Sequence, residues 1–283
     1  MTTTIARGSV KADAASARKW LDEISREAKP KPSAIICNGN AGIGKTSVGA
    51  ATIRPVFLID DQEDGINTLK TSALVDAKIP VLPPATEWSH VIGQLDALAV
   101  QDHEFGTLVV DTLGGMERLC HTFICDRDFG GNWGEKGFTS YAKGYEVALP
   151  EWRRFLSALD RLRQKRGMMI FGISHSLVRP FKNPTGEDYD RYVADMHRKT
   201  WAITEKWADI ILFLNYFVAI DKGKTGRERP KGKGGKSRIM HTEYEAAFDA
   251  KNRHNLPATI EMGGSGGEAW CNLVSAIKSG KAK

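Results

Sequence analysis

The sequence predicts an α/β fold with a mostly parallel central sheet flanked by helices. From Pro32 onward, short apolar runs of strand length alternate with longer helical patterns. The apolar runs are continuous and do not alternate with polar residues, which indicates strands that are buried on both faces and therefore parallel. The 283 residues are enough for one large domain with a substantial core.

The main domain is expected to span residues 32–262. Residues 240–262, at its end, are predicted to add edge strands to the sheet. The core strands are expected at residues 34–37, 56–59, 108–110, 168–173 and 210–214, and the clearest helical patterns lie at residues 88–98 and 155–162.

Two shorter segments flank this domain. Residues 1–31 are expected to form a polar segment and an amphipathic helix, and residues 263–283 a flexible Gly-rich joint with a short helical tail. The apolar face of the first helix would carry Trp20, Leu21 and Ile24.

The most specific motif is a complete G-x-x-x-x-G-K-T phosphate-binding loop that directly follows the first expected strand. Its glycines let backbone N–H groups face the phosphates, and Lys45 places a positive charge on the β and γ oxygens. The helix that follows would direct its positive end toward the anion. The sequence therefore predicts that a nucleoside triphosphate is bound by Asn40, Ala41, Gly42, Ile43, Gly44, Lys45, Thr46 and Ser47.

A magnesium site is predicted beside this loop. The Thr46 hydroxyl is placed to bind Mg²⁺, and Asp111 closes a later apolar strand at residues 107–111. An aspartate after an apolar run also fits an ordinary turn. Because it follows a phosphate-binding loop in the same chain, we interpret Asp111 as the second metal-binding group.

A second apolar strand ends in a run of carboxylates. Asp60, Asp61, Glu63 and Asp64 would repel one another in a packed interior, so this segment is expected to face solvent or cations. Glu63 is the expected group that polarises the attacking water, with Asp60 and Asp61 as alternatives. The other interpretation is an acidic turn that caps a helix starting near Asp64.

Five segments in this order resemble RecA-like ATPases: the phosphate-binding loop and residues 57–65, 109–113, 169–175 and 250–253. They look most like the compact ATP-binding proteins of bacteriophages, which are single-strand-annealing recombinases that keep the RecA core. The resemblance covers roughly residues 32–262. It implies a RecA-like P-loop NTPase core that uses ATP and Mg²⁺.

The resemblance also implies roles for three further residues. His175 stands where this family places a polar sensor that couples the γ-phosphate to the DNA loops. Lys251 and Arg253 match a Lys-x-Arg pair that reaches the phosphates of the adjacent subunit. The resemblance therefore implies a homo-oligomer, either a ring or a filament, whose nucleotide sites are shared between subunits. A gapless match puts Gln62 where RecA has its catalytic glutamate, so Glu63 requires a shift of one residue.

Two long segments without clear periodicity, residues 126–145 and 176–199, match the two DNA loops of this family. Both interleave aromatic with basic side chains, and single-stranded DNA is bound in this way because rings stack on bases and cations follow phosphates. A substrate lid or an oligomer contact is the alternative. The residues expected to contact DNA are Trp133, Lys136, Phe138, Arg179, Lys182 and Arg191.

The net charge of +6 is concentrated between Lys222 and Arg238, a Gly-rich strip with a single acidic residue. Such a strip cannot bury itself and is expected to be a solvated loop. It either contacts a phosphate backbone, through Lys231, Lys233 and Lys236, or only aids solubility.

Together these features favour an ATP- and Mg²⁺-dependent ATPase that binds single-stranded DNA and promotes annealing or strand exchange in phage recombination. A single-strand-binding protein is a further candidate partner. The alternatives are a replicative helicase or helicase loader, and a nucleotide-switched binding module that hydrolyses slowly. The longest apolar run, residues 210–214, is too short to cross a bilayer, so a cytoplasmic location is expected.

Overall fold

The structure is a computed structural model that describes residues 22–27, 30–221 and 231–281, with only the backbone of residues 218–221 and 231–236. The chain divides into a short unit, residues 1–31, and a main unit, residues 32–283. The amphipathic helix expected around Trp20 and Leu21 lies outside the described residues. Within the described ranges, the helices lack the length and hydropathy that a membrane crossing requires.

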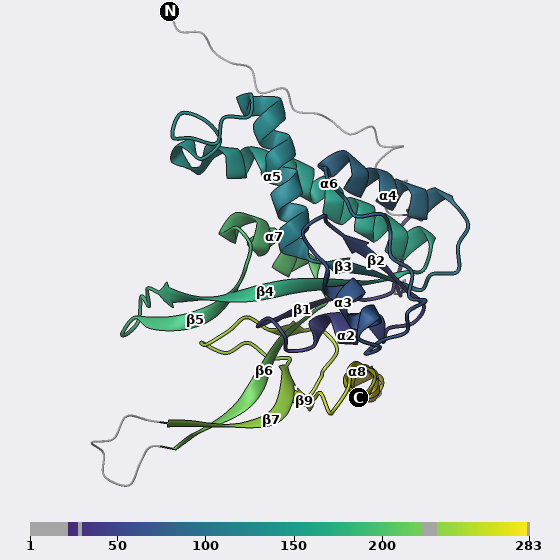
Figure 1. The fold of residues 1–283 in the computed structure, drawn as a ribbon, viewed down its shortest axis with the longest axis vertical. Coiled ribbons are helices and arrows are strands. Elements are labelled where there is room, and N and C mark those ends of the chain that lie inside the picture. Colours follow the sequence, from purple (N-terminus) through teal and green to yellow (C-terminus); the bar gives the residue numbers. More distant parts are fainter. Residues whose placement is uncertain (1–21, 28–29, 222–230, 282–283) are drawn as a thin grey trace, which may run out of the picture. The chain divides into compact units, whose positions relative to one another are not determined.

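The main unit is built on a mixed sheet whose core is parallel (Figure 1). Strands β2, β3, β4, β1 and β6 lie side by side and parallel in that order, and β7 and β9 continue the sheet antiparallel. β5 pairs with the outer half of β4, and β8 pairs with the start of β6. The strands are β1 (Ala34–Gly39), β2 (Pro55–Ile59), β3 (Thr107–Asp111), β4 (Met169–Phe181), β5 (Tyr189–Ala194), β6 (Ile210–Asp221), β7 (Lys231–His241), β8 (Lys251–Asn252) and β9 (Thr259–Glu261).

The five expected core strands and the edge strands near the C-terminus are confirmed, as is the α/β fold with a mostly parallel sheet. Helices cover both faces of this sheet. α4 (Trp88–Val100), α5 (Leu113–Phe129), α6 (Lys143–Lys165) and α7 (Arg198–Trp207) pack on one face, and α2 (Lys45–Ala50), α3 (Gly65–Thr71) and α8 (Gly266–Lys281) on the other.

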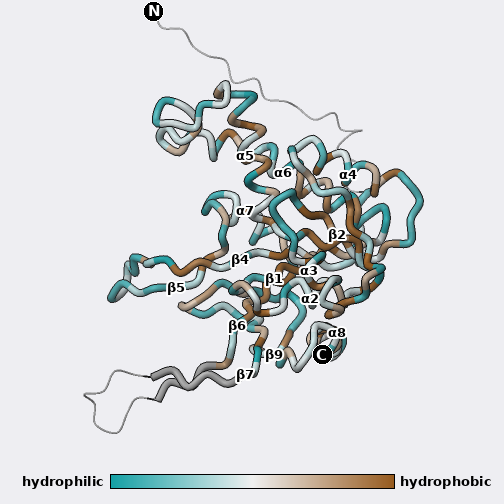
Figure 2. Tube along the Cα trace, in the orientation of Figure 1, coloured by the Kyte–Doolittle hydropathy of each residue, from teal (hydrophilic) through white to brown (hydrophobic). Residues whose placement is uncertain are grey.

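Each strand supplies side chains to both of these layers. Along β1, Ile36 joins the core under α4, α5 and α6, whereas Ile35 and Cys37 join the core under α2 and α8. This alternation explains why the strands read as continuous apolar runs. Figure 2 shows the apolar segments gathered in the middle of the main unit and the polar ones at its surface.

Two predicted loops are strands in the structure. β4 continues to Phe181 and returns through β5, so most of residues 176–199 form a hairpin and not an aperiodic loop. The described part of the basic strip forms β7, which pairs with β6. These hairpin arms lack the continuous apolar pattern of buried strands because they extend beyond the helices that cover the sheet.

The flexible joint expected at residues 263–267 stays a prediction, although α8 begins within it, at Gly266, and contacts to neighbouring residues are formed there. The carboxylate of Glu268 accepts a hydrogen bond from Gly264 N, and Glu268 N donates to the Ser265 hydroxyl, which caps the first turn of α8. A Cβ atom on Gly266 would lie 2.2 Å from the carbonyl oxygen of Ser47. Glycine therefore allows close packing here, and α8 buries Ala269, Trp270 and Leu273 in the core.

Candidate active site

The phosphate-binding loop joins the carboxyl end of β1 to α2, as predicted. Gly42 and Gly44 adopt positive φ angles of 76° and 106°, which L-residues with side chains avoid. Ile43 between them is fully buried and anchors the loop in the core. The loop is thus rigidly attached to the sheet at the end where ligands of parallel α/β folds bind.

Lys45 is buried within this loop, and among the residues that the structure describes no acidic side chain is in hydrogen-bond contact with it. Its ammonium donates to the carbonyl oxygens of Gly39, at 2.8 Å, and Asn40, at 2.9 Å. Burial lowers the pKa of Lys45, whereas the nearby Asp111 carboxylate raises it. His175 pairs with Gly39 in the register of β4 and β1, which brings its Nδ1 to 3.3 Å from the Lys45 ammonium nitrogen.

Thr46 and Asp111 meet as the magnesium prediction requires. The Thr46 hydroxyl donates to Asp111 Oδ2 at 2.9 Å, although β4 separates the strands that carry the two residues. Burial, together with the charge of Glu63, raises the pKa of Asp111 to about 7. A hydroxyl and a buried carboxylate beside a second acid fit Mg²⁺, which prefers oxygen ligands and would supply the missing positive charge.

Glu63 is the acid that points to this site. It accepts a hydrogen bond from Gly65 N at 3.4 Å. A Cβ atom placed on Gly65 would lie 3.2 Å from Glu63 Oε1, 3.5 Å from Thr46 Oγ1 and 3.9 Å from Asp111 Oδ2, so three polar groups gather around this glycine. Burial raises the pKa of Glu63, an effect that its hydrogen bond to Gly65 opposes.

The two alternative acids are held by Arg118, a residue that the sequence interpretation missed. The Arg118 guanidinium donates to Asp60 Oδ2 at 3.1 Å and to Asp61 Oδ1 at 3.0 Å. A Cβ atom on Gly115 would lie 2.0 Å from Asp60 Oδ2, so only glycine leaves room for this carboxylate beside α5. The Gly114-Gly115 pair after Asp111 was the available signal for such a close approach.

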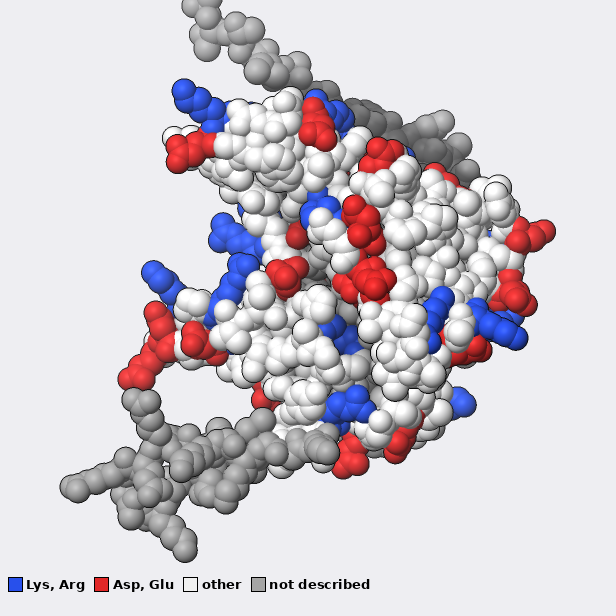
Figure 3. Space-filling model, in the orientation of Figure 1, with Lys and Arg blue, Asp and Glu red and all other residues white. Residues whose placement is uncertain are grey.

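Two cavities meet at this edge of the sheet. A cavity of about 400 Å³ surrounds the phosphate-binding loop, and a larger one of about 700 Å³ shares Glu63 and His175 with it. Figure 3 shows carboxylates gathered on this face of the molecule. The larger cavity is lined by Gln62, Arg118 and Arg179 and by the rings of His121, Trp133, Tyr145 and His197.

The predicted DNA contacts divide into three groups. Trp133 and Arg179 line the larger cavity, and Lys136 and Lys182 are exposed. The predicted DNA contacts of Phe138 and Arg191 are wrong, because both side chains are buried. The side chains of Lys231, Lys233 and Lys236 lie outside the described residues.

Both corrections have a packing cause. The Phe138 ring is fully buried between Phe129 and Tyr145, with ring centres 5.6 and 5.0 Å away, so it cannot stack on a base. Arg191 donates to Asp249 Oδ1 at 2.5 Å and lies over the Phe181 ring. Aromatic and basic residues in an irregular segment therefore also serve the protein interior.

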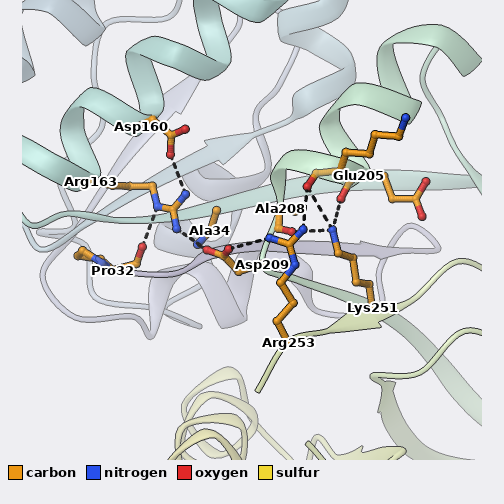
Figure 4. Close-up of polar contacts among 10 residues, drawn as sticks. Pro32, Ala34, Asp160, Arg163, Glu205, Ala208, Asp209, Lys251 and Arg253 are labelled. Carbon is orange, nitrogen blue, oxygen red and sulfur yellow. Dashed lines mark hydrogen bonds and ion pairs between the residues drawn. The ribbon is translucent and has the colours of Figure 1, made fainter. Parts of the chain in front are cut away.

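Lys251 and Arg253 lie near the start of β6, whereas the phosphate-binding loop of the same chain follows the opposite, carboxyl end of the neighbouring strand β1. Figure 4 shows the contacts of the two residues. The Lys251 ammonium donates to the carbonyl oxygens of Glu205, Lys206 and Ala208, at 2.6, 3.3 and 2.9 Å, and so caps the C-terminus of α7. Arg253 donates to Asp209 Oδ1 at 3.4 Å and is half exposed. Contact of this pair with an adjacent subunit's phosphates stays a prediction.

A comparison with known protein families matches residues 31–254 to the AAA domain. The chain belongs to the AAA domain family. None of the curated proteins compared with the chain matches it. Membership in this family indicates an ATPase, which agrees with the phosphate-binding loop and with the Thr46–Asp111 pair of this AAA domain.

Replacement of Glu63 tests the assignment of the water-polarising acid. Glu63→Gln keeps the size of the side chain but removes its charge, so ATP hydrolysis should fall at least ~100-fold while ATP binding changes little. Asp61→Asn is the matched control, because Asp61 contacts Arg118 and should leave the hydrolysis rate within about threefold of the parent. Steady-state hydrolysis and nucleotide titration measure both. Loss of hydrolysis in the Asn variant alone would move the role to Asp61.

The raised pKa of Asp111 predicts that its ionised carboxylate lowers the stability of the metal-free folded protein, by an amount that depends on pH. Because the pKa is about 7 in the folded state against 3.8 for an ordinary aspartate, this group's contribution to stability falls as the pH rises from about 4 to 7. Asp111→Asn removes that cost. The variant's gain in unfolding free energy should therefore be greater at pH 8 than at pH 5 by about 3 kcal/mol. Urea unfolding in EDTA measures it, and a gain that is equal at both pH values would contradict the prediction.

Proposed function

We propose that this AAA domain protein is an ATP- and Mg²⁺-dependent ATPase that assembles on single-stranded DNA and promotes annealing or strand exchange in phage recombination. The observation that carries the proposal is the larger cavity, which shares Glu63 and His175 with the phosphate pocket. A ligand in that cavity would contact the same two side chains as the γ-phosphate. Binding there can therefore change the rate of hydrolysis.

The chemistry follows from the geometry of the phosphate pocket. On nucleotide binding, the Lys45 ammonium exchanges carbonyl partners for phosphate oxygens, and Thr46 and Asp111 would hold a Mg²⁺ ion. When bound, that ion would supply positive charge for the β- and γ-phosphates. Glu63, on the same side of the pocket as Asp111, orients water for in-line attack.

The composition of the larger cavity supports a nucleic-acid ligand. Trp133 is 43% exposed there, and Tyr145 and His197 form a stacked pair with ring centres 3.9 Å apart. Arg179 adds a positive charge at the base of the β4–β5 hairpin, and Figure 3 shows further basic side chains on that side of the molecule. The cavity is also lined by the carboxylates of Asp60, Glu63, Glu117 and Asp195. The support for a single strand, whose bases are free to stack, therefore comes from the exposed Trp133 ring and from Arg179.

His175 is the proposed link between DNA and nucleotide. It stands on β4 between the phosphate pocket and the hairpin that carries Arg179. Burial and the neighbouring Lys45 lower the pKa of His175, so the ring is neutral at physiological pH and its Nδ1 can accept a hydrogen bond from the Lys45 ammonium. A shift of β4 on DNA binding would therefore move a hydrogen-bond partner of Lys45.

DNA-dependent hydrolysis tests this function directly. Single-stranded DNA should raise the hydrolysis rate at least ~10-fold, because it completes a site that shares residues with the γ-phosphate. Trp133→Ala should weaken the DNA affinity by roughly 5- to 150-fold, the cost of one stacked base. Arg154→Ala, which removes an exposed arginine on α6, is the matched control and should change neither quantity.

The outcomes of that experiment separate the alternatives. A slow hydrolysis rate that single-stranded DNA does not change would favour a nucleotide-switched binding module. DNA stimulation with displacement of a paired strand would favour a helicase or helicase loader. Stimulation with annealing of complementary strands and no displacement is the result that the proposal expects.

Mixing two inactive variants tests whether Arg253 acts across a subunit boundary. Arg253→Ala and Lys45→Ala should each be nearly inactive, since an arginine supplied in trans is worth on the order of 10³ in rate. Mixed oligomers contain interfaces that pair an intact loop with an intact arginine, so activity should partly return. A mixture that stays inactive, while native mass measurements show mixed oligomers, would leave Arg253 with its structural contacts to Asp209 and to the Lys206 carbonyl.

A further inference from the structure

Arg238 on β7 reaches the phosphate-binding loop from the far end of the sequence. Its Nη1 donates to the carbonyl oxygen of Ile43 at 3.2 Å, and its Nη2 donates to the carbonyl oxygen of Gly263 at 3.0 Å. It therefore does not belong to the solvated strip in which its sequence position places it. One guanidinium joins the loop to the segment that leads into α8.

The loop is shaped around this side chain. A Cβ atom on Gly44 would lie only 2.8 Å from Arg238 Nη1, so the guanidinium fills the space that a side chain at this position would take. The carbonyl that it binds belongs to Ile43, whose own side chain is buried in the core. Arg238 thus fixes the orientation of the peptide between Ile43 and Gly44, from which α2 begins.

The C-terminal segment is fixed by the same residue. Met262 N donates to the carbonyl oxygen of Arg238 at 2.9 Å, so both the backbone and the side chain of Arg238 hold residues 262–263. Three residues later, Gly266 packs against the Ser47 carbonyl on α2. The nucleotide loop and its helix are therefore clamped by β7 and α8 together.

Arg238 also carries charge into the phosphate pocket, which it lines together with Lys45. A guanidinium has five N–H donors, and the two contacts to Ile43 and Gly263 leave others available. We propose that Arg238 is a positioning residue for nucleotide binding: it holds the loop open for phosphate and couples the bound nucleotide to the C-terminal segment. This inference depends on ATP binding alone and stands apart from the proposal on DNA.

Three substitutions test whether Arg238 acts through the two hydrogen bonds of its guanidinium or only through its positive charge. Arg238→Ala should raise the KM for ATP at least ~10-fold and leave kcat at saturating ATP within about threefold, because the attacking and leaving groups are untouched. Arg238→Lys keeps the charge but replaces the two guanidinium nitrogens that each bind one carbonyl by a single ammonium nitrogen, so it should recover less than half of the lost affinity on a logarithmic scale. Arg154→Ala is the exposed control, with unchanged KM.

Hydrogen exchange supplies the second readout. A non-hydrolysable ATP analogue with Mg²⁺ should slow exchange in residues 262–270 of the parent and the Arg154→Ala control. In the Arg238→Lys variant, which keeps its bulk and charge and should stay folded, this protection should be lost at saturating analogue. An unchanged KM in both variants, full recovery by lysine, or unchanged protection of residues 262–270 would each overturn the inference.

Discussion

The site depends on a hydrogen bond between the first turn of α2 and the end of β3. Thr46 follows β1 and Asp111 closes β3, yet they meet at 2.9 Å across the end of β4. They can do so because parallel strands place their carboxyl ends at one edge, and the register of β4 adds His175 at the same level. The buried Asp111 carboxylate and the neighbouring Glu63 thus form an oxygen-rich site that fits a divalent cation.

The sequence was most informative where structure is local. The five parallel strands, the phosphate-binding loop and Asp111 could be found because burial on both faces and phosphate binding each impose a short pattern. Glu63 lies within three residues of its alternatives Asp60 and Asp61. The structure distinguishes them because Arg118, on a helix that starts about 50 residues later, binds Asp60 and Asp61. No spacing rule within the acidic segment contains that information.

The errors have a different origin, in contacts between separate secondary-structure elements. Phe138 and Arg191 are of residue types that bind nucleic acids, but the rings and the carboxylate that bury them come from other elements. Gly266, in the segment expected to be a flexible joint, is the place where α8 approaches α2. Arg238 likewise looked like one more cation of a charged strip. Residue type and local composition cannot distinguish a freely solvated side chain from one with a partner two hundred positions away.

The contacts of Asp209 indicate which of the two cations, Arg253 or Lys251, could leave its partners within the subunit when subunits assemble. Besides Arg253, this carboxylate accepts hydrogen bonds from Arg163 and from the backbone N–H of Ala34, so it remains paired if Arg253 leaves (Figure 4). Lys251 donates to three carbonyl groups at the end of α7, and one of them, that of Lys206, also accepts from Arg253 at 3.1 Å. If Arg253 changed partners at a subunit contact, both Asp209 and the Lys206 carbonyl would therefore keep a donor, and Lys251 would keep the helix end intact.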